Sequence, residues 1–248
     1  TGCGTEKNQE KSENCYRVAF LGFLNLEKRS KDDTLWYRIG CMYLHGIGTE
    51  ADETKAEHYL TKASDYGNTH ASYQLARLYI RQESQKLSGE SGTAPDYAKI
   101  AKAVKWLEES AAQENPFADY AIGRLYREGT LVAEDMEKAV FHLKRAADAG
   151  NSYAQYQLGK IYLEEDTRNI PAAIQYLTLA AKQKNQFAAY RLGKLYLAGE
   201  ELPKNTELAL HYLKMAADTG NQYAQYALGK MYLIGKDVQQ DKIGRAHV

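Results

Sequence analysis

The chain has 248 residues, of which 44% are hydrophobic, and its 32 basic and 32 acidic side chains leave a formal net charge of zero. A balanced charge provides no overall field that would attract nucleic acid or an anionic membrane surface, and the sequence has no apolar run of about 18 residues that would predict a transmembrane helix. The cysteines, Cys3, Cys15 and Cys41, form no CxxC pair, so neither a disulfide ladder nor a zinc site is indicated, and a reducing compartment is favoured.

We expect residues 1–12 to be a disordered or truncated segment, followed by a helix at about Glu13–Arg29. From Tyr37 onward one pattern recurs: a tyrosine, a small residue three positions on, and another tyrosine three positions further. The first tyrosines are Tyr37, Tyr73, Tyr120, Tyr156, Tyr190 and Tyr226. The small residues lie 36, 47, 36, 34 and 36 positions apart. A period in this range is typical of a solenoid, in which each unit buries its apolar face against its neighbours.

Each unit is predicted to hold two helices. Residues 152–164 illustrate the first helix, because apolar side chains recur there at a spacing of four. Residues 135–149 illustrate the second, which ends at Gly150 in a left-handed cap. Counterparts of the second helix are expected at 54–66, 97–113, 170–182 and 206–219, with Asn115 and Asn185 replacing the capping glycine in two units. The predicted fold is all-α: one solenoid over residues 13–242, a right-handed superhelix of stacked antiparallel helix pairs.

Two segments depart from the period. Residues 82–96 are polar and rich in serine and glycine, which predicts a lengthened surface loop, either a dispensable bulge or a binding loop. At the other end, residues 243–248 break the repeat in mid-unit, and we expect this hexapeptide to be non-native.

The small residues inside the first helices predict close helix packing. Glycine in a helix interior costs roughly 1 kcal/mol relative to alanine, so its recurrence indicates that a neighbour needs the space. The positions are Gly40, Gly123, Gly159, Gly193 and Gly229, with Ala76 as the sixth.

Together with the loop at 45–52 and the Lys55-Ala56, Tyr59-Leu60 and Gly67-Asn68 pairs, this pattern resembles the Sel-one-like repeat (SLR) family, relatives of the tetratricopeptide arrays. The resemblance covers roughly residues 16–242. One unit departs from it, with residues 164–169 in place of the glycine-containing loop, and the family's usual tryptophan in the second helix is replaced in all but one unit, where Trp106 keeps it; His142 is one replacement. The resemblance implies a scaffold or adaptor that holds other proteins together.

One face of the first helices is a candidate binding surface, because offsets of four and seven return to nearly the same side of a helix. It would align aromatic residues, first tyrosines and cations into a stripe suited to a protein or peptide with acidic residues and apolar anchors. The members are Phe117, Tyr153, Phe187 and Tyr223; Tyr73, Tyr120, Tyr156, Tyr190 and Tyr226; and Arg77, Arg124, Lys160, Lys194 and Lys230. The alternative is structural: the tyrosines pack between units, and the cations pair with acidic residues such as Asp148 or Asp218.

The sequence contains no catalytic constellation. Its histidines lack HExxH spacing, and no phosphate-binding glycine loop or nucleophile elbow is present. We therefore expect a cytoplasmic, non-catalytic scaffold that uses no cofactor or metal and binds neither nucleic acid nor membrane. The alternative is the accessory C-terminal region of a mobilisation relaxase from clostridial gut bacteria, which residues 221–237 resemble.

Overall fold

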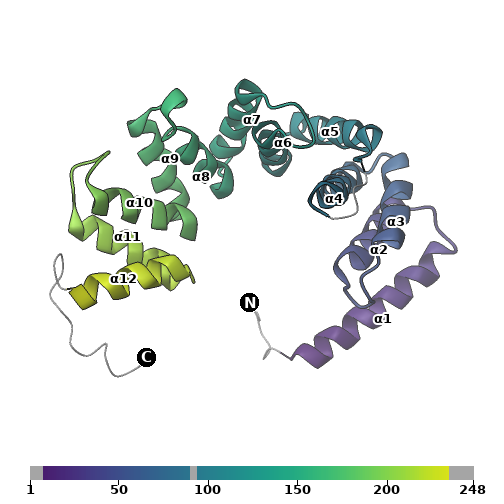
Figure 1. Ribbon diagram of the computed structural model, residues 1–248. Coiled ribbons are helices and arrows are strands. Elements are labelled where there is room, and N and C mark those ends of the chain that lie inside the picture. Colours follow the sequence, from purple (N-terminus) through teal and green to yellow (C-terminus); the bar gives the residue numbers. More distant parts are fainter. Residues whose placement is uncertain (1–7, 90–93, 235–248) are drawn as a thin grey trace. The chain divides into compact units, whose positions relative to one another are not determined.

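The computed structural model describes residues 8–89 and 94–234, and over these ranges it contains α-helices, one short 3₁₀ helix and no strand, which confirms the all-α prediction (Figure 1). The expected non-native hexapeptide lies outside the described residues. The chain forms two compact units: unit 1 is Thr1–Ala118 with Glu128–Glu134, and unit 2 is Asp119–Arg127 with Asp135–Val248.

The helices alternate between first and second members of a pair, as the repeat predicts. In unit 1 they are α1 (Gln9–Glu27), α2 (Asp33–His45), α3 (Glu53–Asp65), α4 (Thr69–Ser88) and α5 (Tyr97–Ala112). Helix α6 (Pro116–Glu128) begins in unit 1, and its residues 119–127 belong to unit 2. Unit 2 continues with α7 (Met136–Asp148), α8 (Ser152–Ile161), η1 (Glu165–Thr167), α9 (Ile170–Lys182), α10 (Gln186–Ala198), α11 (Thr206–Asp218) and α12 (Gln222–Ile234). Helix α1 starts earlier than expected, so residues 9–12 are helical.

A recurrent hydrogen bond joins the second tyrosine of a unit to the residue that precedes the second helix. The backbone N–H of Asp52 donates to the Tyr43 carbonyl at 2.9 Å, and that of Asp135 donates to the Tyr126 carbonyl at 3.0 Å. The Asp52 side chain in turn accepts from the N–H of Lys55 at 2.9 Å, capping α3. One residue thus ties the end of the first helix to the start of the second, because it satisfies orphan backbone groups of both.

The long unit uses a side chain for the same purpose. Helix α4 runs to Ser88, so the first half of the loop expected at 82–96 is two further helical turns. Glu83, fully buried, accepts from the backbone N–H of Asp96 at 2.7 Å and from Lys86 Nζ at 2.8 Å. Burial would raise the pKa of Glu83, but these hydrogen bonds outweigh it and hold the pKa below its ordinary value. The Glu83 carboxylate therefore replaces the carbonyl that closes the turn in other units.

The second helices end in left-handed residues, but not all as predicted. Gly67, Gly150 and Gly220 have φ of 89°, 88° and 93°, as expected. In the two units without glycine the left-handed residues are Glu114 and Lys184, each with φ of 62°, rather than the asparagines. Asn115 and Asn185 instead cap the next helix, each accepting a backbone N–H through its side chain. The expectation for the asparagines was therefore wrong by one position.

These two residues predict a gain in stability. A side chain in the left-handed region clashes with its own backbone, whereas glycine does not. We expect Lys184→Gly and Glu114→Gly each to raise the free energy of unfolding by roughly 0.5–1 kcal/mol, measured by chemical denaturation. Gln175→Gly, at an exposed position inside α9, is the matched control and should lower it by about 1 kcal/mol. A loss of stability in both the Lys184 and the Glu114 variant would contradict the left-handed conformation of these two residues.

Leucine side chains fill the space that the first-helix glycines leave. A Cβ at Gly159 would lie 2.5 Å from Leu177 Cγ, and one at Gly40 would lie 2.7 Å from Leu60 Cγ. Gly123 and Gly193 face Leu143 and Leu213 in the same way, with 2.7 Å in each case. Gly229 is different, since no described atom lies within 4 Å of the position that a Cβ would take there. Close glycine–leucine packing therefore joins α2 to α3, α6 to α7, α8 to α9 and α10 to α11.

Candidate functional site on the first helices

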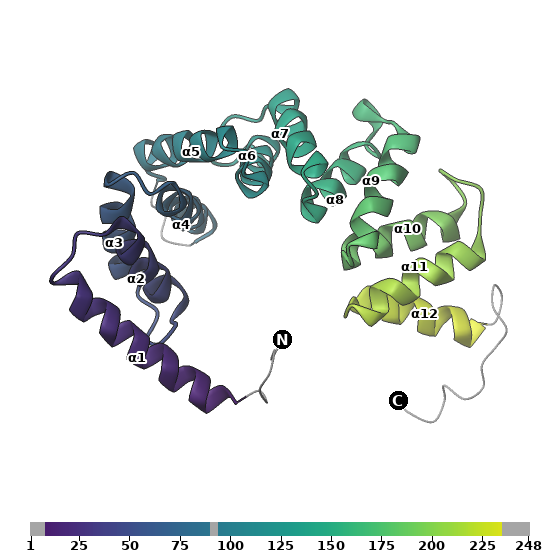
Figure 2. The ribbon, with the colours of Figure 1, turned by 180° about the vertical axis from the view of Figure 1, so that it is seen from behind.

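The first tyrosines contact aromatic residues of the next first helix. Tyr156 lies 5.9 Å from Phe187, and Tyr190 lies 6.1 Å from Tyr223, measured between ring centroids. Tyr120 and Tyr153 repeat the contact at 6.1 Å, and in unit 1 Tyr37 meets His70 at 6.0 Å. In unit 2 the pairs join α6 to α8, α8 to α10 and α10 to α12. Helix α9 lies beside α8, and α11 lies beside α10 (Figure 2). Aromatic ladders thus run from one first helix to the next.

The two rings of each pair have different environments. Tyr120, Tyr156 and Tyr190 are half-buried, whereas Tyr153, Phe187 and Tyr223 are 55%, 47% and 73% exposed. Burial raises the pKa of the Tyr156 hydroxyl. These three first tyrosines therefore have the packing role of the structural alternative, while their aromatic partners face solvent. Phe117 is also exposed, and Tyr226, on the last described helix, is 75% exposed.

The cations lie over the first tyrosines of their own helices. Arg77 Cζ is 5.7 Å from the Tyr73 ring centroid, and Lys160 Nζ is 5.9 Å from that of Tyr156. Arg124 Cζ is 6.0 Å from the Tyr120 centroid, so the predicted alignment of cation and tyrosine holds in three units. No ion pair links Lys160 or Lys194 to a described carboxylate, so the predicted alternative of pairing with Asp148 or Asp218 is not seen for these two lysines.

Two further arginines lie on this face in unit 2. Arg127 Nη1 donates to Gln157 Oε1 at 2.5 Å, and its Nη2 donates to Glu164 Oε1 at 2.6 Å. Arg191 is exposed one position after Tyr190. Neither arginine was predicted, because neither occupies the recurrent cation position. For Arg127 the available signal was a charged residue where the other units carry leucine or isoleucine, whereas Arg191 shares its position with Arg38 of the first unit and does not stand out in this way.

A buried polar cluster was also missed. Asp119 is only 3% exposed, and its Oδ1 lies 2.8 Å from His142 Nδ1 and 3.5 Å from Arg145 Nη1. In other units the residue equivalent to His142 is aromatic, as where Tyr176 stacks on Tyr162 at 6.0 Å. The cluster ties α6 to α7 within unit 2, so His142 has a structural partner. The available signal was Asp119, a charged residue directly before the first tyrosine, where the other units carry uncharged residues.

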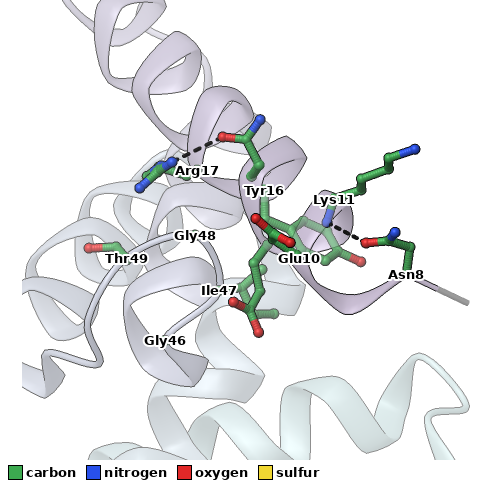
Figure 3. Close-up of a pocket in the computed structure, with 11 residues that line it drawn as sticks. Asn8, Glu10, Lys11, Tyr16, Arg17, Gly46, Ile47, Gly48 and Thr49 are labelled. Atoms are coloured by element: carbon green, nitrogen blue, oxygen red, sulfur yellow. Dashed lines mark hydrogen bonds between the residues drawn. The ribbon is translucent and has the colours of Figure 1, made fainter.

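One hollow in unit 1 lies away from this face. It has a volume of about 830 Å³ between the start of α1 and the loop Gly46–Thr49 (Figure 3). Its polar side chains bond locally: Asn8 Oδ1 accepts from the N–H of Lys11 at 2.9 Å, and Asn14 Oδ1 accepts from Arg17 at 3.0 Å. These contacts do not direct the polar groups toward a common ligand.

Among the residues that the structure describes, none of the helices combines the length and apolar character that crossing a membrane requires.

Known structures share this architecture. A protective antigen of uropathogenic Escherichia coli with an SLR fold superposes with a TM-score of 0.74 and 26% identity, over 91% of this chain and 46% of that one. A Sel1 repeat protein from Oxalobacter formigenes superposes with a TM-score of 0.73 and 24% identity, over 91% of this chain and 86% of that one, which shows a shared fold.

A curated relative matches part of the chain. The ERAD-associated E3 ubiquitin-protein ligase component HRD3B of Arabidopsis thaliana is 28% identical over 136 residues, which is 54% of this chain and 20% of that protein. The chain thus spans a minor part of the length of this relative.

The Sel1 repeat model matches six consecutive segments, at residues 37–68, 69–115, 116–151, 152–185, 186–221 and 222–246. The first five segments follow the helix pairs described above, the sixth begins with α12, and together they confirm the resemblance drawn from the tyrosine pattern. The chain belongs to the Sel1 repeat family.

Proposed function

We propose that this chain is a non-catalytic protein-interaction scaffold that binds peptide segments of its partners on the first-helix face. Sel1 repeat proteins are generally protein-interaction scaffolds. The observation that carries the assignment to this face is the solvent exposure of Tyr153, Phe187 and Tyr223 beside half-buried tyrosines.

Rings held in this way suit peptide recognition. An aromatic side chain fixed at one edge by a packed neighbour loses little conformational freedom when a partner covers its other face. Aromatic residues also supply much of the binding energy at interfaces, because they bury large apolar areas. The ladder repeats from α8 to α10 and from α10 to α12, so it offers several such anchors in a row.

The curated relative supports a role in assemblies. HRD3B is described as a component of a ubiquitin-protein ligase, so that protein works together with other subunits. For this chain we propose the more general property, the holding of protein partners, and assign no particular partner protein to it.

A selection experiment tests the proposal. We expect the chain to enrich binders from a phage-displayed library of random peptides, and Phe187→Ala and Tyr223→Ala each to weaken the enriched peptides at least about tenfold, since hot-spot rings contribute about 2 kcal/mol or more. Phe141→Ala is the matched control, because Phe141 is 57% exposed on the second helix α7. Absence of binders, or equal weakening by Phe141→Ala, would contradict the proposal.

A further inference from the structure

We propose that the first-helix face of unit 2 contains a carboxylate-binding site, formed by Arg127, Lys160 and Arg191 around Tyr156, for an acidic side chain of an extended peptide. The inference rests on the proposed function and names the chemistry of the partner.

Charge is segregated in unit 2 although the whole chain is neutral. Among the described first-helix residues of this unit, the acidic side chain is Asp119, which is buried and engaged by His142; Glu128, the last residue of α6, belongs to unit 1. The basic side chains of the same helices are Arg124, Arg127, Lys160, Arg191, Lys194 and Lys230. The face that carries the aromatic ladder is therefore locally basic, and it would attract and orient an acidic partner.

The cluster around Tyr156 holds more positive than negative charge. Glu164 pairs with Arg127 at 2.6 Å and is the carboxylate that the structure places there. Lys160 Nζ, 5.9 Å from the Tyr156 ring, has no such partner within the described residues. The charge of Arg191 also acts on Tyr156 and Lys160, so one carboxylate is set against three cationic groups and the cluster keeps a net positive charge.

The titration of the central groups agrees with this geometry. Burial lowers the pKa of Lys160, the charges of Arg127 and Arg191 lower it further, and Glu164 acts in the opposite direction. Burial raises the pKa of Tyr156, against the effect of Arg191 and Arg127. Both guanidinium groups therefore act on the same ammonium and phenol groups. A bound carboxylate would relieve their mutual repulsion.

The aromatic ladder indicates which second side chain the bound peptide should carry near its carboxylate. Phe187, from the next first helix, lies 5.9 Å from Tyr156 and is 47% exposed. Packed helices are about 8–10 Å apart, and three residues of an extended chain span about 10 Å. A peptide that crosses from α8 to α10 would therefore place an aspartate or glutamate at the cluster and an aromatic or aliphatic side chain about three residues away at the ladder.

The peptides selected from the random library provide the test. We expect them to be enriched in aspartate or glutamate about three residues from an aromatic or aliphatic residue, and replacing that acid with its amide to weaken binding about tenfold. Lys160→Gln should weaken the acidic peptide by a similar factor and reduce its salt dependence. Lys144→Gln, an exposed lysine on the second helix α7, is the matched control and should change neither.

Stability measurements separate binding from folding. Because the folded environment disfavours the Lys160 charge, Lys160→Gln should melt at the same or a higher temperature than the parent chain. Selected peptides without acidic enrichment, or unaffected by Lys160→Gln, would overturn the inference, while dependence on Phe187 would leave the proposed function intact. Failure to select any peptide would overturn both. Displacement of the acidic peptide by a labelled single-stranded oligonucleotide at equal concentration would assign the cluster to nucleic acid and also overturn the inference.

Discussion

Gly159→Leu should lower the free energy of unfolding by about 1–3 kcal/mol or more, because it overpacks a close helix contact. A Cβ at this position would lie 2.5 Å from Leu177 Cγ, 2.7 Å from Leu177 Cδ2 and 3.3 Å from the Ala173 carbonyl oxygen. The leucine tip cannot move aside easily, since Leu177 is fully buried. Helix α8 would have to shift away from α9 or the core would have to repack. Chemical denaturation monitored by circular dichroism measures the loss.

Gly229→Leu is the matched control. The residue has the same place in the repeat, but nothing described lies within 4 Å of its added Cβ, and Gly229 is exposed. Leucine has a higher helix propensity than glycine, so this variant should lose no stability and should gain up to about 1 kcal/mol. Equal losses at both positions would mean that the effect arises from the helix backbone itself rather than from the leucine of the facing helix.

The two glycines also show what the repeat pattern could predict. Periodicity identified the helices and the small residues inside the first helices, since every repeated position has the same local sequence preferences. It could not distinguish Gly159 from Gly229, because the difference lies in a neighbouring helix and not in the local sequence. Gly229 was expected to face a close neighbour like the others, and the described residues provide none.

The insertion shows a second limit. Serine and glycine content predicted a loop over 82–96, yet residues 82–88 continue α4. The tertiary reason is Glu83, whose buried carboxylate bonds the backbone N–H of Asp96 across the turn. Propensity is a weak guide where one buried hydrogen bond favours the helix.

The candidate site was predictable only in part. Tyrosines and cations that recur in each unit were visible in the sequence, and their proximity follows from helix spacing. Arg127 has no basic counterpart and Arg191 has one, Arg38, so a search for residues that recur in nearly every unit passes over both. Contacts between repeats, such as Tyr156 with Phe187, depend on how the helices stack, which a single repeat does not specify.

Charge reversal on the first-helix face should abolish peptide binding. In the triple variant Arg124→Glu, Lys160→Glu and Lys194→Glu, the face would repel acidic partners, so association should slow most strongly at low salt, where screening is weakest. Helicity and melting temperature should remain close to those of the parent chain, because Arg124 and Lys194 are exposed and Lys160 is half-buried. Surface plasmon resonance with an acidic peptide from the library, at two salt concentrations, measures the change.

The matched control reverses three lysines of the second helices, Lys144→Glu, Lys182→Glu and Lys214→Glu, on α7, α9 and α11. It makes the same change in net charge, so any effect of overall charge appears equally in both triple variants, whereas an effect of the first-helix face appears in one. Peptide binding that survives in the first triple variant would move the site to the opposite face or to residues 82–96. Unfolding of that variant would show that its cations stabilise the helix stack, since the charge alone cannot unfold one variant and spare the other.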